Sequence, residues 1–120
     1  MNAAENRLAL AERLVELAEH SSEAEMRASV SRLYYAVYHV AIMIVGNMAH
    51  GEIPYALNRV ENELGAQYKD LLELRHQADY DPEFVTRQFG SLVNFRIQFP
   101  REMEKARALY ERLRSMVKDS

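Results

Sequence analysis

The sequence contains no cysteine and no tryptophan among its 120 residues. Without cysteine, the chain cannot carry a disulfide framework, a thiolate metal site or a cysteine nucleophile. A lack of cysteine is compatible with a reducing compartment, where disulfides are rare. We therefore expect a cytoplasmic location.

The sequence also lacks a targeting or membrane-spanning pattern. A secretory signal has an apolar core close to the N-terminus. Charged residues interrupt this part of the chain at Glu5, Arg7, Glu12 and Arg13. The longest strongly apolar stretch, Leu33–Val45, is shorter than the ~20 residues that a spanning helix needs. We expect no association with a membrane.

No strand pattern, internal repeat or low-complexity segment is present. A chain of 120 residues, 48% of them hydrophobic, fits a single domain over residues 1–120 with one modest core. The net charge of −3 gives no general attraction to nucleic acid. From Arg96 to Ser120, however, the sequence has 7 basic and 4 acidic residues. This basic end could meet phosphate, but we favour a solvated helix face.

Apolar residues recur at helical spacing in four segments. We expect helices at about Ala3–His20, Glu23–Asn47, Pro54–Gln77 and Pro100–Val117. The inner stripe of the first comprises Leu10, Leu14, Leu17 and Ala18, and that of the third Leu57, Val60, Leu64, Tyr68, Leu71 and Ala78. The last helix should bury Met103, Ala106, Leu109, Tyr110, Leu113 and Val117. Long helices with short joins predict an all-α fold, an antiparallel bundle of four to five helices.

The second of these helices is the one we expect at the centre. Ser22 and Glu25 have capping-box spacing at its start, and Gly46-Asn47 suits its end. From Leu33 to Val45 it is apolar nearly all round, as expected of a helix surrounded by others.

The remaining boundaries are set by glycine and proline. Gly65 permits a bend in the third helix, and Pro82 follows its end. Phe84–Phe99 should be a short helix or an irregular segment packed by its four phenylalanines, with Gly90 interrupting it. Pro100 then suits the first turn of the last helix.

A polar face interrupts the apolar second helix. Arg32 and His39 are seven residues apart and share this face with Tyr35 between them. A guanidinium on an apolar helix is costly unless it is paired. The interpretation we favour is structural, with Arg32 paired to a carboxylate such as Asp79 and His39 satisfied in the core. The alternative is a direct part in catalysis.

Titratable residues also gather at the end of the third helix. Arg75 and Asp79 are four apart and can pair, and the negative end of the helix dipole suits Arg75 and His76. Local helix termination explains this much. An RNA-cleaving site would also need a cation for the phosphate, here Arg75 or Arg32. It would further need a group near neutral pKa to move the 2′-hydroxyl proton, here His76 or His39.

We expect neither a metal site nor a cofactor. Glu73–His76 is the one pair with the Glu-x-x-His spacing of di-iron bundles. One such pair is too few to build a site of that kind.

Two segments resemble the HEPN superfamily (higher eukaryotes and prokaryotes nucleotide-binding domain), in its prokaryotic branch. RLYYAVYH at Arg32–His39 is similar to an Arg-x-Tyr-Tyr-Ala-x-x-His segment on the second helix of that branch, and RHQADY at Arg75–Tyr80 to an Arg-x-x-Ala-Asp-Tyr segment after its third. His50-Gly51 falls in the loop where such proteins often have a similar pair. The likeness covers Ala3 to Asp81, while the segment from Phe84 is longer than in that branch.

The resemblance implies a four- or five-helix bundle that commonly forms homodimers, with a groove at the dimer interface holding the polar motifs. Many members are metal-independent RNases and toxins of toxin–antitoxin pairs, often beside a minimal nucleotidyltransferase. Their hallmark is Arg, four to six residues, then His. Here Tyr80 stands at that place after Arg75, and Arg32–His39 meets the spacing on a different helix. A tyrosine, with a pKa near 10, is a poor base, but Tyr80 could hydrogen-bond a phosphate or accept a nucleotidyl group.

Two functions follow from this resemblance. The first is a toxin component, or an RNA- or nucleotide-binding module, of a prokaryotic toxin–antitoxin-like system. If such a homodimer cleaves RNA, the reaction would be metal-independent and leave a 2′,3′-cyclic phosphate. The expected catalytic residues are Arg75, Tyr80 and His39, and the expected substrate-binding residues are Arg32, Tyr35, His76 and Asp79. The second function is a non-enzymatic helical partner that docks a minimal nucleotidyltransferase antitoxin or binds a nucleotide.

Overall fold

The computed structural model describes residues 3–16 and 23–117, and the regular structure in these ranges is entirely helical. The all-α prediction is therefore confirmed. The described residues form six α-helices rather than four or five, together with one 3₁₀ turn. The elements are α1 Ala3–Glu16, α2 Glu23–Val45, η1 His50–Glu52, α3 Ile53–Val60, α4 Leu64–Tyr80, α5 Phe84–Phe89 and α6 Leu92–Met116.

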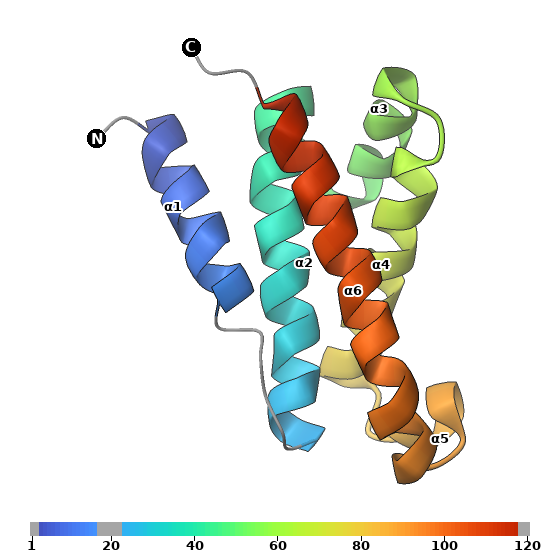
Figure 1. Ribbon diagram of the computed structural model, residues 1–120. Coiled ribbons are helices and arrows are strands. Elements are labelled where there is room, and N and C mark those ends of the chain that lie inside the picture. Colours follow the sequence, from blue (N-terminus) through green and yellow to red (C-terminus); the bar gives the residue numbers. More distant parts are fainter. Residues whose placement is uncertain (1–2, 17–22, 118–120) are drawn as a thin grey trace.

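The four long helices run alternately up and down (Figure 1). Helix α2 lies at the centre and packs against α1, α4 and α6. The short helices α3 and α5 lie at opposite ends of the bundle, each beside the long helix that follows it in the chain. The arrangement brings α2 and α4, which carry the two predicted polar segments, side by side.

The prediction of a long, buried central helix is confirmed by α2. Val30, Leu33, Val37 and Val40 are completely buried there. Burying one such side chain contributes roughly 1.5–3 kcal/mol. Gly46 follows the helix with a φ of +93°, a conformation that glycine adopts without strain. By length and composition, Glu25–Val45 would be long and apolar enough to cross a membrane, although here half of that segment is buried inside the bundle.

The predicted third helix is two helices, so that prediction is wrong. α3 ends at Val60 and α4 begins at Leu64. The break lies at Glu61, which has an extended backbone, and Glu63, which has a φ of +79°. A left-handed glutamate has no local sequence signal, because glycine or asparagine usually occupies this conformation.

Gly65 has a different role from the predicted bend. A β-carbon at this position would lie 2.1 Å from the backbone oxygen of Pro54 and 2.5 Å from Oδ1 of Asn58. The Gly65 N–H donates to that same Oδ1 over 2.9 Å. Glycine therefore allows the first turn of α4 to touch α3, and Asn58 joins the two helices.

Helix α6 begins earlier than predicted, at Leu92 instead of Pro100. Ser91 caps it by accepting a hydrogen bond from the Asn94 N–H over 3.1 Å. Pro100 lies inside the helix on its exposed side, where water can reach the carbonyl that its missing N–H leaves free. The predicted phenylalanine cluster is confirmed, with ring centroids 5.0–6.0 Å apart from Phe84 to Phe99.

Two predicted stripe positions are wrong. Leu10 is 47% exposed and Val60 is 46% exposed. In α1, Ala11, one position further on, is buried, and Leu8 and Leu14 pack at the edge of the core. The other predictions for this region, at Leu17, Ala18 and the Ser22 cap, lie outside the described residues. Helix α4 also continues three residues past the predicted Gln77 end, to Tyr80.

The contact at Gly65 generates a stability prediction. Gly65→Ala should lower the free energy of unfolding by about 1–3 kcal/mol, because the added methyl group overpacks against backbone atoms. Gly51→Ala is the matched control, since nothing lies within 4 Å of its β-carbon position. Urea unfolding of both variants measures the difference. Equal stabilities would contradict the close approach of α3 and α4.

Candidate functional site

Aromatic rings and one guanidinium gather where α2, η1 and α4 meet. We call this group the tyrosine–arginine cluster, and it comprises Tyr34, Tyr35 and Tyr38 from α2, His50 from η1, and Tyr68 and Arg75 from α4. Helical spacing on α2 places Tyr38 beside the other two tyrosines, since it is three residues from Tyr35 and four from Tyr34. The ring centroids of Tyr34 and Tyr35 are 5.2 Å apart.

Arg75 is the centre of the cluster. Its side chain is 13% exposed. Nη2 donates to the Tyr35 hydroxyl over 3.1 Å, and Nε lies 3.1 Å from Oδ2 of Asp79. The guanidinium carbon lies 5.5, 5.2 and 5.9 Å from the ring centroids of Tyr34, Tyr35 and Tyr80. Facing rings attract a cation within about 6 Å, so the cluster stabilises and orients this charge.

The guanidinium retains donor capacity beyond these contacts. Nε is buried and its approach to Asp79 is not aligned as a hydrogen bond. Nη1 has no partner among residues 3–16 and 23–117, and it is not buried. One edge of the arginine fork is thus fixed by protein groups while Nη1 remains for a ligand.

A chain of hydrogen bonds supports the rings beneath Arg75. The hydroxyls of Tyr34 and Tyr68 are 2.7 Å apart, and the Tyr34 hydroxyl also bonds to Nδ1 of His50. Burial raises the pKa of Tyr34 to about 12 and raises the pKa of Tyr68 as well, so both remain protonated. The two hydroxyls and the His50 ring are therefore joined in one hydrogen-bonded chain.

His50 is held neutral by its surroundings. Burial lowers its pKa most, and the charges of Arg75 and His76 lower it further. Its ring stacks on Tyr38 with centroids 4.4 Å apart and planes 5° from parallel. The imidazole is therefore neutral near pH 7 and bonds to the Tyr34 hydroxyl through Nδ1.

His39 lies apart from Arg75, one ring beyond the cluster. The Tyr38 ring is 5.4 Å from His39 and 4.4 Å from His50. Nη1 of Arg7, from α1, is 2.9 Å from Nδ1 of His39. Burial lowers the pKa of His39, followed by the charge of Arg7. Of the predicted catalytic residues, His39 thus packs toward α1, whereas Arg75 and Tyr80 come together on α4.

The end of α4 presents polar side chains to solvent. Tyr80 is 73% exposed, and its ring centroid is 6.2 Å from that of the exposed His76. Asp79 pairs with Arg75, as the four-residue spacing predicted, and its Oδ2 also lies 3.5 Å from Oγ of Ser31 on α2. The alternative partner predicted for Asp79 was Arg32, which is half-buried on α2.

Sequence reasoning missed several residues that build this end of the bundle. Arg27 donates to the carbonyls of Ala78, Asp81 and Pro82 over 2.8–3.2 Å and so satisfies the end of α4 from α2. No local signal marks it, because its partners are more than 50 residues away. His50 had a signal in the His50-Gly51 pair, but nothing in that loop indicated its partners.

A groove opens beside this site, between α3 and α4. Its volume is about 370 Å³. Tyr55 and Asn58 line it from α3, and Lys69, Glu73 and His76 line it from α4. His76 therefore belongs both to the groove and to the polar end of α4.

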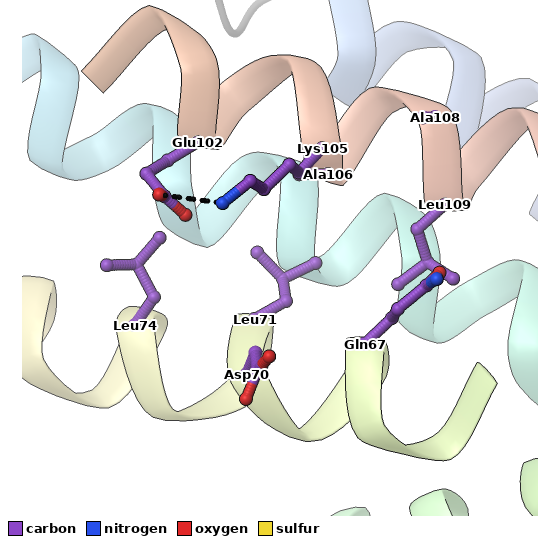
Figure 2. A pocket seen from close by; sticks show the side chains of 9 residues that line it. All are labelled: Gln67, Asp70, Leu71, Leu74, Glu102, Lys105, Ala106, Ala108 and Leu109. Carbon is purple, nitrogen blue, oxygen red and sulfur yellow. Dashed lines mark hydrogen bonds and ion pairs between the residues drawn. The ribbon is translucent and has the colours of Figure 1, made fainter. Parts of the chain in front are cut away.

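A second groove of about 280 Å³ lies between α4 and α6. Figure 2 shows its apolar floor, formed by Leu71, Leu74 and Leu109, and the Lys105–Glu102 ion pair at its rim. None of the predicted site residues lines it. This face is therefore separate from the tyrosine–arginine cluster.

Comparison with family models, curated proteins and solved structures finds no match to this chain. Within the described ranges, no three His, Asp or Glu side chains are placed to hold a metal ion.

The two neutral histidines generate a pH prediction. Folding lowers the pKa of His39 and of His50 below the ordinary histidine value near 6.5. At a pH below that value, the unfolded chain therefore binds more protons than the folded chain. Stability should therefore fall as pH decreases from 7 toward 5.

Urea unfolding at pH 7, 6 and 5 measures this dependence. The double substitution His39→Asn and His50→Asn keeps an acceptor near each Nδ1 position and removes both titrations. It should flatten the slope whatever its effect on stability at pH 7. A slope equal to that of the wild type would overturn the assignment.

Proposed function

We propose that this chain is an RNA-binding module of the HEPN type, the toxin component of a toxin–antitoxin-like pair. Its phosphate-binding centre is Arg75 with the exposed His76 and Tyr80 beside it. The single observation that carries the proposal is the state of Arg75, which is oriented by Tyr35, Asp79 and three rings while Nη1 has no protein partner among the described residues.

The Arg75 side chain is preorganised to bind an anion. A free arginine side chain loses rotamer entropy when it binds a phosphate. At Arg75 three surrounding rings, the hydrogen bond to Tyr35 and the ion pair with Asp79 restrict the side chain before any ligand arrives. Arginine hydrogen bonds to phosphate are charge-assisted and stronger than neutral ones. His76 and Tyr80 add donors on the solvent side of the same helix end.

The meeting of the two HEPN-like segments supports the same proposal. Tyr35 belongs to the RLYYAVYH segment and Arg75 to the RHQADY segment, and they are in contact across 40 residues of sequence. If the polar residues served only to stabilise the fold, the two segments would not need to meet at one site that faces solvent.

Cleavage of the bound RNA is the catalytic form of this proposal. The 2′-oxygen would attack the adjacent phosphorus as its proton passes to a base, and the bond from phosphorus to the 5′-oxygen would break. The leaving 5′-oxygen would take a proton from water, giving a 2′,3′-cyclic phosphate and a 5′-hydroxyl. His76 is the imidazole best placed to take the proton, because it is exposed beside Arg75. His39 and His50 bind protein groups through Nδ1 instead.

RNA-binding measurements test the proposal. His76→Ala and Tyr80→Ala alter exposed side chains, and Arg75→Lys keeps the charge without the planar fork. Each should weaken the binding of a labelled single-stranded RNA in EDTA, with a loss of about tenfold or more for Arg75→Lys. Arg101→Ala, exposed on α6, is the control for general charge loss.

The same mixtures report on chemistry. A cyclic-phosphate product that disappears in Arg75→Lys and His76→Ala, but not in Arg101→Ala, would support catalysis. Wild-type binding no stronger than that of Arg75→Lys, across single-stranded, transfer and ribosomal RNA, would refute the proposed function.

A second candidate function is favoured by an exposed apolar patch at the start of α6. Leu92, Val93 and Ile97 are 44%, 70% and 57% exposed, and Val93 and Ile97 are four residues apart on one side of the helix. Exposed apolar clusters of this kind commonly mark protein interfaces. The patch supports a docking role, either for a second copy of the chain or for a minimal nucleotidyltransferase.

Charge substitution in this patch separates the two functions. The double variant Val93→Glu, Ile97→Glu should abolish binding to the partner. Light scattering measures self-association, and co-purification measures binding to a nucleotidyltransferase encoded beside the gene. Gln98→Glu, exposed on the same helix, should change neither. If the double variant loses all partners yet retains RNA binding, the docking surface and the RNA site are distinct.

A further inference from the structure

The groove between α3 and α4 has the composition of a nucleobase site. Tyr55 offers a ring that is 69% exposed. Asn58 lines the groove while Oδ1 accepts the Gly65 N–H over 2.9 Å. The amide is therefore held with its Nδ2 hydrogens free to donate. Together these two residues of α3 supply a stacking surface and a positioned donor.

The α4 side of the groove supplies charge. Lys69, Glu73 and His76 line it, and their spacing of four and three residues places them on one face of the helix. Glu73 accepts hydrogen bonds and repels phosphate. The base of a nucleotide therefore fits beside Glu73, with its phosphates toward Lys69 and His76.

The same face of α4 leads from the groove to the proposed phosphate centre. Tyr80 follows His76 by four residues and continues this face, next to Arg75. From Lys69 to Tyr80 the helix rises about 16 Å. An RNA strand lying along α4 would pass from Arg75 to Tyr55 without leaving the surface.

We propose that the α3–α4 groove binds one unpaired base of a single-stranded RNA, stacked on Tyr55, while Arg75 and His76 hold the phosphate of a neighbouring nucleotide. This inference rests on the proposed function and adds a base subsite to it. The groove volume of about 370 Å³ is in the range of small-molecule sites, about 300–1,000 Å³. Stacking of bases on exposed aromatic residues is how proteins commonly bind single strands.

A cycle between protein and RNA substitutions tests the stacking contact. The probe is a fluorescein-labelled eight-nucleotide RNA, whose binding is measured by fluorescence anisotropy in EDTA. A second set of probes has the same sequence, and each member lacks the base at one different position. Tyr55→Ala should weaken binding of the intact strand about tenfold or more, and Tyr55→Phe should preserve it. One abasic strand should bind the wild type as weakly as the intact strand binds Tyr55→Ala, with no further loss in that variant.

Val60→Ala is the matched control, since Val60 is exposed on α3 but does not line the groove. Thermal unfolding shows whether each variant is folded. Because Tyr55 is exposed, its substitution should leave the fold intact. Competition with a free 5′-nucleotide distinguishes a strand from a mononucleotide ligand. If a micromolar concentration of free nucleotide displaced the RNA, the ligand of the groove would be a mononucleotide and the inference would be overturned.

The outcomes separate this inference from the function on which it rests. If His76→Ala weakens RNA binding and Tyr55→Ala does not, the base subsite is refuted and the phosphate centre stands. If Tyr55→Ala weakens the intact and every abasic strand equally, stacking is refuted as well. If the wild type binds none of the strands, both proposals fall.

Discussion

The charge of Arg75 is the constraint on which the arrangement of this bundle depends. A guanidinium that is 13% exposed must find compensation within the protein, and at Arg75 that compensation comes from both α2 and α4. Tyr34 and Tyr35 face it from α2, while Asp79 and Tyr80 hold it from its own helix. The rings below it are themselves fixed by hydroxyl bonds that end on a neutral His50. Removing the charge would therefore loosen the contact between two helices as well as a binding group.

The position of α3 is a second constraint, and it depends on backbone geometry rather than on charge. The left-handed Glu63 turns the chain, and Gly65 lets α4 pass close to Pro54 and Asn58. Without this turn, a continuous helix would carry Tyr55 away from Lys69 and His76, and the groove would not exist. At the other end of α3, η1 brings His50 onto the Tyr38 ring of α2. The irregular segment between α3 and α4 thus positions the groove beside the cluster.

Part of this structure follows directly from sequence patterns. The apolar run in α2 identified the central helix because a helix with no polar face must be surrounded, and four-residue spacing identified the Arg75–Asp79 pair. The break before Leu64 did not follow, since the apolar stripe from Leu57 to Tyr68 continues through it and Glu63 is not a turn residue. Pro100 led to a predicted helix start that is too late, because proline suits a first turn but is also tolerated on an exposed helix face. The contact between Tyr35 and Arg75 joins residues 40 apart, which no local spacing can indicate.

The placement of the tyrosines also makes the molecule its own optical probe. The chain has seven tyrosines and no tryptophan, so its near-ultraviolet absorption, dichroism and emission arise almost entirely from tyrosine. Five of these rings lie in or against the tyrosine–arginine cluster, and Tyr55 lies in the neighbouring groove. Tyr110, on α6, is the exception. Intrinsic spectra of this protein should consequently report on the candidate site more than on the rest of the fold, without any attached label.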